Sequence, residues 1–169
     1  MEVENILVPI DYSGGAQGAL QWGASLADKY GAKLILLHVI SKTVEELSPE
    51  GGPFVSSTSS FHEVQVPNTQ SFARPTIIVD LVDQAHTELH DFANRNLKDT
   101  VPVQVEVAVG RPTVEILRVA HEEKVDLIVM GTHGRTGVRY LLLGSVAEAV
   151  THLAPCPVFT VRIGDEAVP

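Results

Sequence analysis

The sequence predicts a doubly wound α/β domain, in which five parallel strands alternate with four helices. Short apolar runs rich in Val, Ile and Leu alternate along the chain with longer stretches whose apolar residues recur at helical spacing. Most of these runs are apolar throughout, which is typical of parallel strands that are buried on both faces. At 169 residues with 44% hydrophobic side chains, the chain can bury one substantial core. We therefore expect a single domain over residues 1–169.

The first half begins with a strand, a helix and a second strand. Residues 5–10 (NILVPI) form the first apolar run, which stops at an Asp-Tyr-Ser-Gly-Gly turn. Apolar residues at helical spacing then predict a helix that extends to about Tyr30, with Gly31 as its stop signal. Residues 33–40 (KLILLHVI) predict the second strand. Because a helix joins them, the two strands are expected to be parallel and to form a right-handed βαβ unit.

A segment at about residues 41–75 interrupts this alternation. It is rich in Pro, Gly, Ser and Thr, and it is too long for an ordinary connection. Loops of this length are usually functional lids or partly disordered segments. We therefore expect a flexible insertion in the domain.

The helical pattern returns at residues 76–97, where apolar residues form one stripe along a predicted sheet-covering helix. His86 and His90 lie four residues apart on this helix, which is the spacing of a two-histidine metal pair. The sequence fixes no third ligand beside them, and the order His-x-Glu-x-His differs from the metalloprotease motif HExxH. We therefore predict no metal site.

The second half continues the alternation with three more strands. Residues 101–109 (VPVQVEVAV) alternate, which predicts a strand with one less buried face, near the edge of the sheet. A turn leads into a helix with Pro112 near its first position, and residues 127–130 (LIVM) predict the next strand. A last helix and a last strand at residues 158–163 (VFTVRI) complete the expected elements.

Glycines gather between the fourth strand and the last helix. Such residues allow positive φ and let a ligand approach the main chain, and the sequence places them at Gly131, Gly134 and Gly137. Gly144 precedes the helix, and Ser145 is its expected N-cap. Free amides and the helix dipole at such an end favour a phosphate. The alternative is purely structural, with the glycines making turns and Ser145 forming a capping box with Glu148.

The net charge of −9 and the absence of any Lys/Arg cluster argue against nucleic acid and anionic membranes as partners, because both require a basic patch. A bound phosphate is therefore expected to be held mostly by main-chain groups. The acidic start lacks the pattern of a secretory signal, and no apolar run approaches membrane-spanning length. We expect a cytoplasmic protein. Cys156 is the only cysteine, so no disulfide can form within the chain.

The expected sheet brings three strand ends to one crevice. In doubly wound sheets, ligands bind outside the carboxyl ends of the strands, where the strand order reverses. These ends are residues 9–11, 38–40 and 130–131. Asp11, at the tip of the first strand, is suited to accept hydrogen bonds from a sugar hydroxyl or an amino group. It is equally suited to cap the following helix.

The sequence also resembles a known family. Gly131-x-x-Gly134, nine further residues and then Gly144-Ser145 match the G-2x-G-9x-G-(S/T) signature of ATP-binding universal stress proteins. The opening ILVPIDYS, the VDLIVMGTHGRTG block and the closing APCPVFTVR are also similar to that family. The resemblance covers nearly the whole chain outside residues 41–75.

This resemblance implies an adenine nucleotide, ATP or its relatives AMP and ADP, with Mg²⁺ or Mn²⁺ carried on the phosphates. The main chain of Val39, together with Pro9 and Asp11, would hold the adenosine. The glycine-rich turn and the start of the last helix would hold the ribose and phosphates. The implied contact residues are Pro9, Asp11, Val39, Gly131, His133, Gly134, Arg135, Gly144, Ser145 and Val146.

The resemblance further implies the strand order 3-2-1-4-5 and a homodimer that forms through the last strand, Val158 to Arg162. An apolar edge strand benefits from such pairing. The implied function is that of a cytoplasmic stress-response or sensor protein that binds ATP.

Three functions remain open at this point. The sequence lacks the P-loop motif G-x-x-x-x-G-K-[ST], and no residue stands out as a general base, although His133 could serve. We therefore favour binding without fast turnover. The alternatives are a slow ATPase or a phosphate- or nucleotide-transferring enzyme that uses metal-bound ATP, and a plain dimeric interaction module with a structural glycine signature.

Overall fold

The computed structural model describes residues 2–41, 74–97, 100–132 and 143–162, without the side chains of residues 74–78. Strands and helices alternate along these segments in the order β1 (Asn5–Pro9), α1 (Gly14–Tyr30), β2 (Lys33–Ile40), α2 (Arg74–Asn96), β3 (Val103–Val109), α3 (Pro112–Glu122), β4 (Leu127–Gly131), α4 (Ser145–Leu153) and β5 (Val158–Val161). The insertion expected at about residues 41–75 lies outside the described residues except at its two ends.

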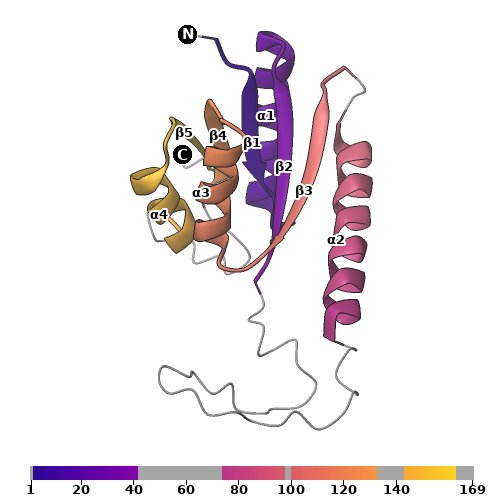
Figure 1. Cartoon of the computed structure of the whole chain (residues 1–169). Coiled ribbons are helices and arrows are strands. Elements are labelled where there is room, and N and C mark those ends of the chain that lie inside the picture. Colours follow the sequence, from indigo (N-terminus) through magenta and orange to yellow (C-terminus); the bar gives the residue numbers. More distant parts are fainter. Residues whose placement is uncertain (1, 42–73, 98–99, 133–142, 163–169) are drawn as a thin grey trace, which may run out of the picture.

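All the strands form one sheet in the order β3-β2-β1-β4-β5, and every neighbouring pair is parallel. This confirms the predicted fold class and strand order. The order reverses between β1 and β4, so the chain moves from β1 toward one edge and then crosses over to the other (Figure 1). β3 lies at an edge, as its alternating pattern predicted.

Helices cover both faces of the sheet, and each face has its own core. α1 and α2 bury Leu20 and Leu89 against Ile6, Val8 and the other side chains of one face. On the opposite face, α3 and α4 bury side chains of their own against the strands, namely Ile116, Val119, Ala120, Ala147 and Val150. Figure 1 shows this arrangement, with α3 and α4 together on one side of the sheet. In the described part of the chain, no helix is both long and apolar enough to cross a membrane.

Element ends follow local chemistry. Ser13 is the N-cap of α1, since its Oγ accepts from the Ala16 amide at 3.2 Å, and α1 ends at Gly31 with φ 67°. β3 begins at Val103 rather than at residue 101. Pro102 has no N–H to give to the ladder, although its carbonyl accepts from the Leu34 amide.

The expected N-cap of the last helix was wrong. Gly144 occupies the N-cap position with φ −68° and ψ 152°, and no side chain caps the helix there. Ser145 is therefore the first helical residue, and the capping box with Glu148 does not form. Sequence spacing places a helix end only to within a residue or two.

Gly131 also differs from expectation, because positive φ is not the reason for its glycine. Among described glycines only Gly31 and Gly110 have positive φ. A Cβ on Gly131 would lie 2.8 Å from the carbonyl carbon of Gly15, so the glycine lets the start of α1 approach β4. Gly134 and Gly137 lie outside the described residues.

Candidate nucleotide site

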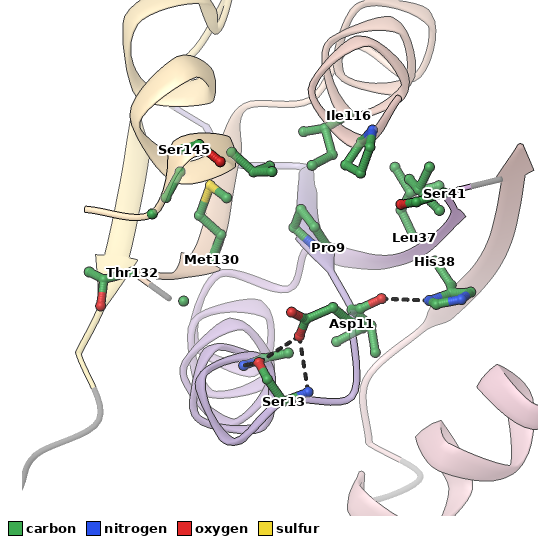
Figure 2. Close-up of a pocket in the computed structure, with 18 of the residues that line it drawn as sticks. Pro9, Asp11, Ser13, Leu37, His38, Ser41, Ile116, Met130, Thr132 and Ser145 are labelled. Carbon is green, nitrogen blue, oxygen red and sulfur yellow. Dashed lines mark hydrogen bonds between the residues drawn. The ribbon is translucent and has the colours of Figure 1, made fainter. Parts of the chain in front are cut away.

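A cavity of about 530 Å³ opens at the carboxyl ends of β1, β2 and β4, where the strand order reverses (Figure 2). Seven of the residues predicted for the site line it, namely Pro9, Asp11, Val39, Gly131, Gly144, Ser145 and Val146. The other three, His133, Gly134 and Arg135, lie outside the described residues. The strand ends and the start of α4 therefore meet around one space, as the topology predicted.

Asp11 is held by the turn that follows β1. Its Oδ1 accepts from the Ser13 amide at 3.0 Å and from the Ser13 hydroxyl at 2.5 Å (Figure 2). The helix cap is thus Ser13, and Asp11 supports that cap instead of capping α1 itself. The carboxylate has a fixed position at the cavity wall, which is what an acceptor for a ligand hydroxyl requires.

The main chain of Val39 faces the space beyond the end of β1. The Ile10 amide donates to the Leu37 carbonyl at 2.7 Å, so the main-chain groups of Leu37 face β1. These groups alternate in direction along a strand, so those of Val39 face the same side. The Ile40 carbonyl, which accepts from the Gly110 amide just after β3, fits this alternation. Because β1 ends at Pro9, Val39 presents one donor and one acceptor to the cavity.

His38 lines the cavity beside the turn that follows β1, and the Tyr12 ring packs against it. His38 Nδ1 lies 2.7 Å from the Ile10 carbonyl oxygen. A carbonyl only accepts, so Nδ1 carries the proton of this bond. Tyr12 has φ 63°, which is uncommon for a residue other than glycine, and its ring lies 4.9 Å from that of His38 and 5.4 Å from that of Phe92 on α2.

The other end of the cavity is formed by the start of α4. The Gly144 amide donates to the Thr132 carbonyl at 2.7 Å, so the chain returns to the tip of β4 before the helix begins. The first-turn amides of Ser145, Val146 and Ala147 have no acceptor within the helix, because the first bond of the helix runs from Glu148 to Gly144. All three residues line the cavity, so the positive end of the α4 dipole faces it.

The described lining includes no Lys or Arg, and Asp11 is its one carboxylate. An anion in this space would therefore be stabilised by main-chain amides, by the helix dipole and by any cation it carries. That main-chain groups hold a phosphate here, as the net charge of −9 led us to expect, stays a prediction.

Sequence reasoning missed part of the wall. Met130 lies at the β4 end that was expected to face the crevice, but Ile116 adds apolar surface from α3, and Thr132, which is buried, anchors Gly144. Ile116 looked like an ordinary core residue in the sequence. Pro112 had a recognisable signal, since a proline at the start of a helix after the third strand belongs to the same edge of the sheet.

Two other features of the sequence, the His86 and His90 pair and Cys156, lie apart from the cavity. Among the described residues, no group of three or more His, Cys, Asp or Glu side chains could hold a metal. His90, one of the two spaced histidines, instead forms a hydrogen bond with Asn94 at 3.1 Å. Burial raises the pKa of the Cys156 thiol, which opposes formation of a reactive thiolate.

Known proteins are similar to this chain in both sequence and fold. Universal stress protein YxiE from Bacillus subtilis is 31% identical over 161 residues, which are 93% of this chain and 97% of that protein. Universal stress protein MJ0577 from Methanocaldococcus jannaschii is 29% identical over 167 residues, 94% of each chain. The solved structure of MJ0577 superposes with a TM-score of 0.73 at 26% identity, covering 98% of this chain and 100% of that one.

A universal stress protein family member from Arabidopsis thaliana, solved with AMP bound, has the same fold. Its TM-score is 0.55 at 16% identity, covering 98% of this chain and 96% of that one. The model of the Universal stress protein family matches residues 2–162, which is nearly the whole chain. This protein therefore belongs to the universal stress protein family.

Proposed function

We propose that this protein binds an adenine nucleotide, ATP in its working form, and that occupancy of the cavity is the signal it transmits in a stress response. The observation that carries the proposal is the pairing of two features in one cavity: main-chain groups of Val39 at one end and the first turn of α4 at the other. A volume of about 530 Å³ lies within the usual range for small-ligand pockets.

The Val39 end suits an adenosine. Adenine presents an acceptor, N1, beside a donor, its amino group, and Val39 offers the complementary donor and acceptor. Pro9 lies beside this edge and gives the base an apolar surface, and the Asp11 carboxylate is the expected acceptor for a ribose hydroxyl. Binding of AMP by the Arabidopsis relative supports this assignment.

The α4 end suits the phosphates. Ser145 and Val146 would donate their main-chain amides to phosphate oxygens, and Gly144, whose own amide is held by the Thr132 carbonyl, would let the phosphates approach that turn closely. Gly131, His133, Gly134 and Arg135 would enclose the ribose and the phosphate tail. Since no described lining residue is Lys or Arg, Mg²⁺ or Mn²⁺ carried by the phosphates would supply the missing positive charge. Chelation of divalent ions is therefore expected to weaken ATP binding more than AMP binding.

The first experiment identifies the ligand directly. Purified protein is denatured, the released small molecules are identified by mass spectrometry, and the affinities of ATP, ADP and AMP are measured by calorimetry. Recovery of an adenine nucleotide, with ATP affinity in the micromolar range or tighter, supports the proposal. Absence of nucleotide together with no measurable binding would overturn it. Steady release of ADP from added ATP would favour a slow ATPase instead.

Gly144→Val tests the phosphate end. Its φ and ψ suit any residue, so the branched side chain adds bulk beside the α4 amides without backbone strain. We expect ATP affinity to fall by at least about tenfold, the loss of roughly one good hydrogen bond. Ser145→Ala is the matched control, because it removes only a hydroxyl from the same turn. Equal ATP affinity in Gly144→Val and the parent protein would contradict the assignment.

We further propose that the nucleotide-binding form is a homodimer that pairs through β5. In such a dimer, ATP would act by shifting the population of a state that binds a partner, which requires different ATP affinities in the two states.

A further inference from the structure

We propose that His38 determines base selectivity at this site, by engaging the Ile10 carbonyl so that the Val39 amide remains available to the ligand. The inference rests on the proposed nucleotide function and concerns a residue to which the preceding assignment gives no role. His38 acts here as a positioning residue, because it works through Ile10 and Val39 and not through contact with the base.

The hydrogen-bond register between β1 and β2 leads to this role. The Ile10 amide donates to the Leu37 carbonyl, and in a continuing parallel ladder the next bond would run from the Val39 amide to the Ile10 carbonyl. Between these described residues that bond is not formed. The Ile10 carbonyl accepts from His38 Nδ1 at 2.7 Å instead. Figure 2 shows this bond as the dashed line that ends on the His38 ring.

One aromatic contact packs against the imidazole, and a second supports its partner. The His38 ring lies 4.9 Å from that of Tyr12, and the Tyr12 ring makes a T-shaped contact with Phe92 at 90°, with centroids 5.4 Å apart. Tyr12 has φ 63°, so the chain turns away from β2 immediately after Ile10 and Asp11. The β1–β2 ladder therefore ends at the point where the cavity begins.

The chemical consequence is selectivity between bases. Adenine has an acceptor at N1, whereas hypoxanthine and guanine have an N1–H donor and a carbonyl acceptor at position 6. A free Val39 amide beside a Val39 carbonyl matches adenine and opposes the other two. If the Ile10 carbonyl captured the amide, only the Val39 carbonyl would remain. Adenine would then keep its match at position 6 but lose the one at N1, so its advantage over the other two bases would shrink.

Two variants separate the hydrogen bond from the ring. His38→Phe keeps an aromatic ring against Tyr12 but removes the Nδ1 donor, and His38→Asn keeps a donor near that position but removes the ring. The readout is the ratio of AMP to inosine monophosphate affinity. We expect the parent protein to prefer AMP, His38→Phe to lose about tenfold of that preference, and His38→Asn to keep most of it.

Hydrogen exchange of the Val39 amide, measured by NMR without nucleotide, gives a second and independent result. In His38→Phe, the Ile10 carbonyl becomes available, and exchange of this amide is expected to slow by about tenfold relative to the parent. An unchanged affinity ratio in a folded His38→Phe variant, or an unchanged exchange rate, would overturn the role of His38. Failure of the parent protein to bind AMP at all would instead overturn the proposed function.

Discussion

The glycines of this protein differ in whether a side chain could replace their hydrogen. The atoms that surround each glycine determine this. A Cβ on Gly131 would lie 2.8 Å from main-chain atoms of Gly15, which cannot move as a side chain can. A Cβ on Gly18, by contrast, would meet Val161 Cγ1 at an ordinary 3.5 Å. The first glycine of the family signature is therefore needed for packing, whatever else it does for a ligand.

Gly131→Ala is expected to lower the free energy of unfolding by about 1–3 kcal/mol, the usual cost of overpacking. Gly18→Ala is the matched control and is expected to raise it by about 0.5–1 kcal/mol, because Gly18 lies inside α1, where alanine is the better helix former. Urea denaturation of both variants measures the difference. Equal stabilities would show that α1 can shift away from β4 without cost.

Glu106 illustrates the cost of a partly buried charge. Burial raises the pKa of Glu106, and the neighbouring Arg118 guanidinium, 4.0 Å away, lowers it by less. Its Oε2 is buried and has no hydrogen-bond partner among the described residues. Arg118 is engaged more closely by Glu115 at 2.8 Å and by Glu122.

Glu106→Gln is therefore expected to stabilise the protein near neutral pH. A raised pKa in the folded state means that this group favours folding when protonated and loses that contribution as the pH rises through the folded pKa. Glutamine cannot ionise, so the variant should gain up to about 1 kcal/mol at pH 7, and the gain should vanish as the pH falls toward about 4. Thermal unfolding across this pH range measures it. Glu122→Gln, more exposed beside the same Arg118, should show no such gain.

At the scale of helices and strands, hydrophobic pattern was sufficient for the fold. Residues 33–40 were predicted as a strand with both ends correct, since an apolar run between Gly31 and the insertion leaves little choice. The alternating valines of β3 also indicated its place at the edge. Pattern alone could not give the strand order, which came from the resemblance to a family and which the sheet confirms.

Details that depend on tertiary contacts were beyond the sequence. Serine is common at helix N-caps, yet Gly144 takes that position instead of Ser145, because the Gly144 amide donates to the Thr132 carbonyl just after β4. The positive φ of Tyr12 depends on rings from β2 and α2 that are distant in the chain. The candidate site was therefore predictable as a set of strand ends, while the arrangement of its main-chain donors was not.

The start of β1 is fixed by a carboxylate from another part of the chain. Asp126 Oδ2, just before β4, accepts from the amides of Glu4 at 2.8 Å and Asn5 at 3.0 Å. The Asp126 amide also donates to the Asn5 carbonyl at 2.9 Å. This two-way link sets the register between the two strands that flank the switch point.

Asp126→Ala should reduce the free energy of unfolding by about 1–2 kcal/mol, because it leaves two strand-end amides without their charged acceptor in a partly exposed setting. Asp126→Asn keeps an acceptor oxygen and should lose less than half as much. Denaturant titration provides the comparison. A loss of the same size in both variants would mean that the negative charge, and not the acceptor geometry, matters.

At the scale of the whole molecule, the two edges of the sheet differ. α2 packs along β3, whereas β5 pairs with β4 alone, and its outward side carries exposed aromatic surface. Phe159 on β5 is 40% exposed and Trp22 on α1 is 52% exposed, with ring centroids 5.6 Å apart. An apolar edge strand with neighbouring exposed aromatic rings favours pairing with a second chain.

Phe159→Lys is therefore expected to convert the proposed dimer to a monomer, since a lysine on an edge strand opposes strand pairing and removes apolar contact. Analytical ultracentrifugation at tens of micromolar protein measures the change. Trp22 is the single tryptophan of the chain, so its emission gives a second readout and should shift to longer wavelength when the partner leaves. Val79→Lys, at an exposed position on α2, is the control and should sediment like the parent. A parent protein that sediments as a monomer, or a Phe159→Lys variant that remains dimeric, would exclude β5 as the interface.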